Sequence, residues 1–172
     1  MITIISGTNR DDSYSLKFSE FYKESLEKSG VKAQILDLKV LPENFLFTEM
    51  YGQRTDRYEQ LLEQFIYSVD KIMLVSPEYN GSFSGILKSF IDSFEPKKII
   101  DKKMAMIGVA AGRAGNLRGM DHMTNCMHYM KVHVMPNKLP ISQAYTLFKD
   151  DKLSDVATIE GIESHVQEFI NY

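Results

Sequence analysis

The sequence predicts an α/β protein with a doubly wound, five-stranded parallel sheet and helices on both faces. Five short apolar runs typical of buried strands alternate with stretches whose apolar residues recur every three or four positions, the period of an amphipathic helix. The 172 residues are 44% hydrophobic and 25% charged, a composition typical of one folded domain with a substantial core. We therefore expect a single domain over residues 1–172.

The expected elements follow one another in strict alternation. Strands are expected at residues 1–6, 31–38, 71–76, 103–110 and 132–135. Helices are expected at residues 14–26, 58–69, 83–94 and 117–130, and beyond residue 152. Since parallel neighbours need crossover connections, this alternation places helices on both faces of the sheet. Five strands favour the flavodoxin-like strand order over the six-stranded dinucleotide-binding order.

Composition and charge argue against several classes of protein. The net charge of -3 offers no electrostatic attraction for nucleic acid or an anionic membrane. Cys126 is the single cysteine, so neither an intrachain disulfide nor a cysteine metal cluster is expected. No stretch approaches the roughly 20 apolar residues of a membrane span, and the first residues do not resemble a signal peptide. We expect a cytoplasmic protein with no membrane span.

Three loops are candidates for a ligand site. In doubly wound sheets, ligands bind beyond the carboxyl ends of the strands, where the strand order reverses. The loops that follow the first, third and fourth expected strands cover residues 6–15, 76–82 and 110–116. The site is therefore expected where these three loops meet.

The first loop is rich in groups that bind anions. A helix N-terminus offers free N–H groups and partial positive charge, and this loop adds the side chains of Thr8, Asn9, Arg10, Ser13 and Ser15. Neither a G-x-G-x-x-G pattern nor a P-loop lysine is present, so a phosphomonoester fits better than a dinucleotide. The alternative remains open at this point: Ser13 is simply a helix cap and Arg10 a surface charge.

The second loop combines stiffness with a flat aromatic side chain. Pro77 fixes its own backbone angle and Gly81 permits a tight turn, while Tyr79 and Asn80 offer a ring and an amide. Such a loop is able to line a planar heterocycle. An ordinary turn whose tyrosine packs on the core is the alternative.

Together the two loops resemble the NADPH-dependent FMN reductase family, which has a flavodoxin-like fold. The family pattern G-S-x-R-x-x-S is matched by residues 7–13, with Thr8 in place of serine. The pattern P-E-Y-N-G-S-x-x-G-x-L-K-x-x-x-D is matched by residues 77–82 and by Gly85, Leu87, Lys88 and Asp92. Ser93 stands where the family often has tryptophan. The resemblance extends from residue 1 to about residue 136.

The resemblance implies roles for the residues of all three loops. The FMN phosphate would be held by Thr8, Arg10, Ser13 and Ser15, with Asn9 and Tyr14 in the same loop. The isoalloxazine ring would lie along Pro77, Glu78, Tyr79, Asn80 and Gly81. The third loop is similar to the family's glycine-rich turn beside the pyrimidine end of the flavin, through Gly112, Arg113 and Gly115. The small residues Gly112 and Gly115 would leave the space over the ring open.

The reaction implied by the resemblance takes place at FMN N5, so no catalytic side chain is expected. NAD(P)H would be the co-substrate, and a flavin, quinone, azo compound or similar small molecule would take the electrons in a ping-pong mechanism. A flavodoxin-like FMN electron carrier with no nicotinamide turnover is the alternative, although such carriers often shield the flavin with tryptophan, which this chain lacks. A phosphate-binding module without flavin is a third interpretation.

Two further expectations concern metals and assembly. His122 and Cys126 lie one helical turn apart beside Asp121, yet no third ligand is evident, and we expect no metal. The apolar stretch at residues 45–51 and the methionine-rich helix face around Met123 exceed the obvious needs of a small core, which suggests an interface. For the methionines, plain core packing is an alternative that stays open at this point. Similar reductases form dimers or dimers of dimers, and we expect a homodimer or homotetramer.

Overall fold

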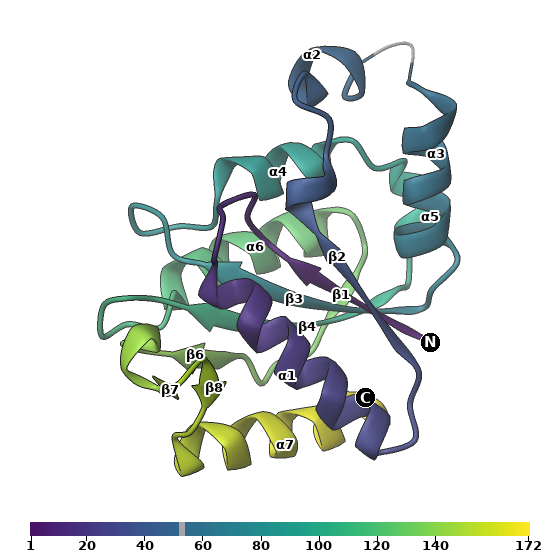
Figure 1. The fold of residues 1–172 in the computed structure, drawn as a ribbon. Helices are drawn as coiled ribbons and strands as arrows, with labels where there is room; N and C mark the ends of the chain where they lie inside the picture. The colour runs from purple at the N-terminus through teal and green to yellow at the C-terminus, as the bar shows by residue number, and fades with distance from the viewer. Residues whose placement is uncertain (52–53) are drawn as a thin grey trace.

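The centre of the protein is a parallel sheet with the strand order β2-β1-β3-β4-β5, shown in Figure 1. A computed structural model describes residues 1–51 and 54–172. Its principal strands are β1 (Ile2–Ser6), β2 (Ala33–Asp37), β3 (Lys71–Pro77) and β4 (Lys103–Val109). The chain leaves β1 toward β2 and later returns to the other side of β1 at β3, so the strand order reverses between these two neighbours. The doubly wound, flavodoxin-like architecture is confirmed.

The fifth position of the sheet is divided between two short strands. β5 (His133–Val134) pairs with the start of β4, and β6 (Leu139–Ile141) pairs in parallel with its end. The expected strand at residues 132–135 therefore supplies only half of this edge. Pro136 has no N–H for the sheet ladder and interrupts the edge, whereas Pro140 is tolerated in β6 because its strand borders β4 on one side only.

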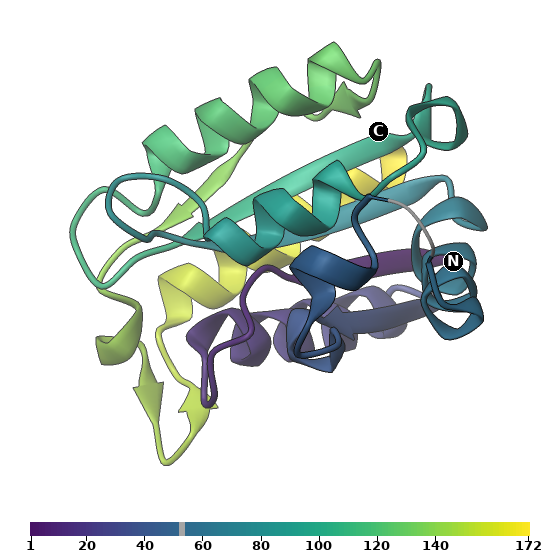
Figure 2. The same ribbon diagram turned by 90° about the horizontal axis from the view of Figure 1, so that it is seen from above.

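Helices cover both faces of the sheet, as the view from above in Figure 2 shows. One face carries α1 (Tyr14–Lys28) and α7 (Val156–Asn171), and the other carries α3 (Asp56–Leu62), α4 (Gly85–Asp92) and α6 (Leu117–Tyr129). The expected helix at residues 58–69 is α3 followed by a π-helical turn, η2 (Glu63–Tyr67). The short elements are η1 (Leu38–Val40), α2 (Phe45–Thr48), α5 (Pro96–Ile99), η3 (Ala144–Thr146), β7 (Phe148–Lys149) and β8 (Lys152–Leu153). Within the described residues, none of the helices has the length and apolar character needed to cross a membrane.

Two hydrophobic clusters, one on each face, hold these layers together. Successive strand residues point to opposite faces, so Ile5 packs under α4 and α6 whereas Ile4 packs under α1 and α7. Met120, Met123 and Met127 are almost fully buried in the cluster of α4 and α6. The expectation that this methionine face exceeds the needs of the core is therefore wrong, because these side chains fill the core.

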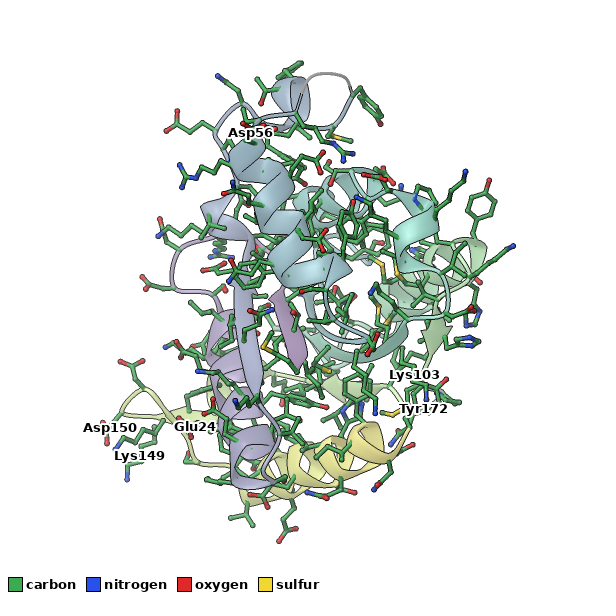
Figure 3. The ribbon with its side chains drawn as sticks, turned by 90° about the vertical axis from the view of Figure 1, so that its right-hand side faces the viewer. Glu24, Asp56, Lys103, Lys149, Asp150 and Tyr172 are labelled. Atoms are coloured by element: carbon green, nitrogen blue, oxygen red, sulfur yellow. The ribbon has the colours of Figure 1, made fainter. Side chains whose placement is uncertain are left out.

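Lysines at the starts of β3 and β4 secure the C-terminal helix. Lys71 donates hydrogen bonds from Nζ to the carbonyl oxygens of Phe169 and Ile170, at 3.0 and 2.9 Å. Lys103, its neighbour in the sheet register, donates to the carbonyl oxygen of Tyr172 at 2.5 Å, and both residues are labelled in Figure 3. The last carbonyls of a helix have no partners within the helix, so these ammonium groups satisfy them.

Candidate functional site

The main candidate site is a pocket of about 480 Å³ at the carboxyl edge of the sheet, where the strand order reverses. Four segments of the chain surround it: the loops after β1, β3 and β4, and the region of η3. Its lining residues are Thr8, Arg10, Asp11, Asp12, Ser13, Tyr14, Ser15, Pro77, Glu78, Tyr79, Val109, Ala110, Ala111, Ala144 and Tyr145. This volume is in the usual range for a small-molecule or cofactor site.

The N-terminus of α1 opens into this pocket. Ser13 caps the helix, with its Oγ accepting a hydrogen bond from the backbone N–H of Leu16 at 3.2 Å. Ser15 is only 1% exposed, and its Oγ has no hydrogen-bond partner. The first turn of α1 carries no acidic residue. Free amides, partial positive charge and an unpaired buried hydroxyl therefore meet at one point, as an anion site requires.

Charged side chains border the first loop. The exposed Arg10 lines the pocket, and its backbone N–H donates to Thr8 Oγ1 at 3.3 Å. Asp11 forms an ion pair with Lys39, and Asp12 adopts a left-handed backbone conformation with φ of 49° at the loop's turn. Ser13 is thus a helix cap, but its hydroxyl accepts in that bond and can still donate its own proton, so the contacts of Ser13, Arg10 and Ser15 with a phosphate stay predictions.

The second loop is a tight turn held against the first. Tyr79 and Ser82 exchange two backbone hydrogen bonds of 2.8 and 3.2 Å, and Asn80 and Gly81 between them have φ angles of 52° and 79°. Positive φ at both central residues is the geometry of a type I′ turn. The phenol oxygen of Tyr79 lies 2.7 Å from Thr8 Oγ1. Tyr79 lines the pocket, whereas Asn80 and Gly81 form the tip of the turn outside it.

The third loop contributes small side chains and one buried turn. Ala110 and Ala111 line the pocket, and the exposed Gly112 and Arg113 follow just outside it. A Cβ on Gly115 would lie 2.6 Å from Cβ of Pro140 and 2.8 Å from the backbone nitrogen of Ile141. Gly115 therefore faces β6, contrary to the expectation that it borders open space over the pocket. A Cβ on Gly112 would meet nothing within 4 Å, which leaves that position open.

Asn116 joins the third loop to the second. The side chain is fully buried, and its Nδ2 donates to the carbonyl oxygens of Ser76 and Pro77, both at 3.0 Å. Its backbone is left-handed, with φ of 63°. These bonds fix the start of α6 against the end of β3 and so set the spacing between two walls of the pocket.

Several lining residues were not singled out from the sequence, although four of them lie in the loops where the site was expected. The full set is Asp11, Asp12, Val109, Ala110, Ala111, Ala144 and Tyr145. The first five adjoin or interrupt the motifs, and motif spacing could have suggested them. Ala144 and Tyr145 enter the pocket because backbone hydrogen bonds hold η3 beside the third loop, and no sequence pattern marks that contact. Of the predicted residues, Asn9, Asn80, Gly81, Gly112, Arg113 and Gly115 do not line the pocket.

The histidine and cysteine of α6 do not form part of a metal-ligand cluster. Nδ1 of His122 lies 3.0 Å from the hydroxyl of Ser82, so this side chain contacts the second loop instead. In residues 1–51 and 54–172, no three histidine, cysteine, aspartate or glutamate side chains gather in a way that could hold a metal ion.

Known proteins are similar to this chain in sequence and in fold. A model of the NADPH-dependent FMN reductase family matches residues 1–146. An NAD(P)H-dependent FMN reductase of Pseudomonas aeruginosa is 29% identical over 171 residues, which cover 95% of this chain and 89% of the relative. An NADPH azoreductase of a Bacillus species is 26% identical over 81% of this chain and 72% of its own length. The structure of a Paracoccus denitrificans flavoenzyme, an NAD(P)H:(acceptor) oxidoreductase, superposes with a TM-score of 0.81 at 21% identity, covering 99% of this chain and 95% of that one.

The chain belongs to the NADPH-dependent FMN reductase family, because the family model covers most of its length. It is therefore an FMN-dependent oxidoreductase. The residues of the pocket fit this cofactor: the unpaired hydroxyl of Ser15 and the amides of α1 suit a phosphate, and Tyr79 and the small residues of the third loop suit a flat ring.

Proposed function

We propose that the protein passes electrons from NAD(P)H through bound FMN to a small acceptor, such as a flavin, a quinone or an azo compound. The observation that carries this proposal is the buried, unpartnered hydroxyl of Ser15 at the N-terminus of α1, inside a pocket that three sheet loops converge on. When bound, FMN supplies the redox chemistry, accepting hydride at N5 and returning electrons to the acceptor. The protein's contribution is placement and electrostatics.

The first loop would hold the phosphate end of the cofactor. Ser15 Oγ and the free amides of α1 offer hydrogen bonds, and Arg10 offers a guanidinium that can bind two phosphate oxygens at once. Thr8 stays engaged with Tyr79, and Ser13 stays engaged in capping. In this arrangement Thr8 and Ser13 shape the cradle, while Arg10 and Ser15 bind.

The second and third loops would hold the ring. Pro77, Glu78 and Tyr79 form one wall of the pocket, and the backbone N–H of Glu78 is already used by the carbonyl oxygen of Val109 at 2.8 Å. The wall is therefore rigid before a ligand arrives. Ala111 and Gly112 leave room for a nicotinamide, since neither carries a bulky side chain.

A ping-pong mechanism follows if the nicotinamide and the acceptor bind in turn to the same face of the flavin ring. With NADPH and a quinone both varied, initial rates should give parallel double-reciprocal lines, and protein stripped of FMN should show no turnover. Intersecting lines would contradict the shared site. An FMN carrier without nicotinamide turnover, the alternative function, would show no steady-state oxidation of NADPH at all.

We further propose that the protein is a cytoplasmic homodimer or homotetramer that associates through the side of α4 and α6. A groove of about 510 Å³ lies there, lined partly by Ile91, Phe94 and Tyr129, and Tyr129 is 90% exposed. Phe47 in α2 is 88% exposed. Lys88 and Asp92 also line this groove, and they form an ion pair of 2.6 Å at its edge.

Light scattering tests the assembly. The wild-type protein should have at least twice the mass of one chain, and Tyr129→Arg should shift the population toward monomers. Val156→Arg changes an apolar residue of α7 that is also exposed, on the other face of the sheet, and should leave the mass unchanged. A monomeric wild-type protein at micromolar concentration would contradict the proposal.

A further inference from the structure

The fourth side of the pocket is closed by a strap that follows β6. The strap, defined as residues 142–153, contains η3 and the hairpin of β7 and β8. Three hydrogen bonds hold its first residues against the third loop: Ser142 Oγ to the carbonyl oxygen of Arg113 at 2.6 Å, and the N–H groups of Gln143 and Ala144 to the carbonyl oxygens of Gly112 and Ala110 at 2.9 and 3.0 Å.

The other end of the strap packs on the first turns of α1. The ring of Phe148 lies 5.4 Å from that of Tyr14 and 5.1 Å from that of Phe18, centroid to centroid. Lys17 forms a 2.7 Å ion pair with Asp151, which is exposed and contributes little stability. Lys149 and Asp150 project from the hairpin tip, away from the body of the protein (Figure 3). The aromatic packing is thus the main anchor at this end.

These two anchors place Tyr145 at the mouth of the pocket. It lies between the segment bonded to the third loop and the segment packed on α1, and it is one of the lining residues. Its neighbours on that wall are Ala110, Ala111 and Ala144, which are too small to cover its ring. The side chain is 54% exposed, although it stands in a pocket otherwise lined by the three loops after β1, β3 and β4.

We propose that Tyr145 is a flavin-binding residue whose ring contacts the isoalloxazine of bound FMN. This inference rests on the proposed function. The phosphate-binding groups all lie in the first loop and at the start of α1, whereas the wall beside Tyr145 consists of Val109 and alanines. An apolar wall with one aromatic side chain suits the flat ring of the cofactor, because aromatic rings in contact gain more than their burial alone provides.

Equilibrium titration of the protein without flavin tests this contact, with FMN and riboflavin as separate ligands. Tyr145→Ala should weaken both ligands by the same factor, about 3- to 10-fold. Tyr145→Phe keeps the ring and should bind both ligands as the wild-type protein does. Val156→Ala removes an exposed apolar side chain of α7, outside both this pocket and the proposed interface, and serves as the control.

Three outcomes would overturn the inference. Wild-type affinity of Tyr145→Ala for both ligands would show that the ring makes no contact. If Tyr145→Ala and Tyr145→Phe both lost affinity for FMN but not for riboflavin, the Tyr145 hydroxyl would contact the FMN phosphate, and its ring would not contact the isoalloxazine. Wild-type protein that bound neither ligand would contradict the proposed function itself, before any variant is compared.

Discussion

The hydroxyl of Thr8 lies 2.7 Å from the phenol oxygen of Tyr79, although 71 positions separate the two residues in the sequence. The contact joins the loop after β1 to the loop after β3 at the edge where the strand order reverses. Ser84, which caps α4, makes a second connection by donating from Oγ to the carbonyl oxygen of Gly7 at 2.5 Å. Two walls of the pocket are thus fixed to each other without a ligand, which lowers the cost of ordering them on binding.

Replacement of Arg10 should weaken only those contacts that the protein makes with the phosphate of FMN. Arg10→Ala should weaken FMN binding by about 1.5 to 3 kcal/mol, the range for a hydrogen bond to a charged group. Riboflavin lacks the phosphate and should bind the variant and the wild-type protein equally. Titration with both ligands measures the difference, and an equal loss for riboflavin would show that Arg10 is not a phosphate ligand.

Replacement of Ser15 should have opposite effects on binding and on stability. Its buried Oγ has no partner without a ligand, and an unsatisfied buried hydroxyl costs stability. Ser15→Ala should therefore raise the free energy of unfolding of the flavin-free protein by about 1 kcal/mol while weakening FMN by about 1.5 to 3 kcal/mol. Urea unfolding and FMN titration measure the two effects.

Ser6 supplies the matched control for Ser15. Its Oγ is also buried without a partner, at the end of β1, but Ser6 does not line the pocket. Ser6→Ala should stabilise the flavin-free protein in the same way and leave FMN affinity unchanged. If the two variants had the same FMN affinity, the unpaired hydroxyl of Ser15 would not be a cofactor ligand.

Two glycines of the third loop should respond differently to substitution: Gly112 affects access to the pocket, whereas Gly115 affects the stability of the fold. Gly112→Trp adds bulk beside Ala111 and should leave FMN bound while slowing its reduction by NADPH about 10- to 100-fold, because hydride transfer requires close stacking. Ala114→Trp places the same bulk further along the exposed part of the loop and serves as the control. A wild-type reduction rate for Gly112→Trp would place the nicotinamide elsewhere.

Gly115→Ala should instead destabilise the protein, because its Cβ would collide with β6.

Acidification should destabilise the protein through His165. The side chain is 1% exposed, with Nδ1 3.2 Å from the hydroxyl of Tyr22 and Nε2 3.2 Å from the carbonyl oxygen of Asn137. Burial lowers its pKa below 6.5, partly offset by the hydrogen bond to Asn137 and by Glu168. The unfolded chain therefore binds the proton first, so this contribution to stability is complete above pH 6.5 and is lost as the pH falls through the lowered pKa of the folded state.

Urea unfolding between about pH 8 and 5 measures this dependence. His165→Gln has no proton to gain at this position, so its stability should vary less with pH than that of the wild-type protein. His128→Gln changes an exposed histidine of α6 and should follow the wild-type curve. Parallel curves for His165→Gln and the wild-type protein would show that another group causes the loss.

The sequence predicted the sheet well because its first four strands are continuous apolar runs, each followed by a helical pattern of period 3.6. The divided edge was not predicted, since Pro136 ends the pattern and Pro140 argues against a strand in β6. The sequence pattern predicts one continuous helix over α3 and the π-helical turn η2, because both conformations place the same apolar residues toward the sheet.

The candidate site, too, was predicted only in part from the sequence. Short motifs predicted Thr8, Arg10, Ser15 and Tyr79 as neighbours, and the pocket brings them together. A glycine in a sequence pattern indicates that a side chain would not fit there, but it does not show which neighbour would be in the way. The close approach of Gly115 to Pro140 could therefore be found only from the structure. Tyr145 enters the pocket because backbone bonds and the side chains of Ser142 and Phe148 anchor the strap, and no sequence motif marks these contacts.

Anaerobic mixing of the FMN-loaded protein with NADPH tests the central claim most directly. The flavin absorbance should bleach rapidly with NADPH, or with NADH if that nucleotide is preferred, and should return when a quinone is added. This result requires a nicotinamide to reach the flavin through the side of the pocket at Ala111 and Gly112. A protein that failed to bleach with either nucleotide, yet was reduced by dithionite, would be an FMN electron carrier and would contradict the account.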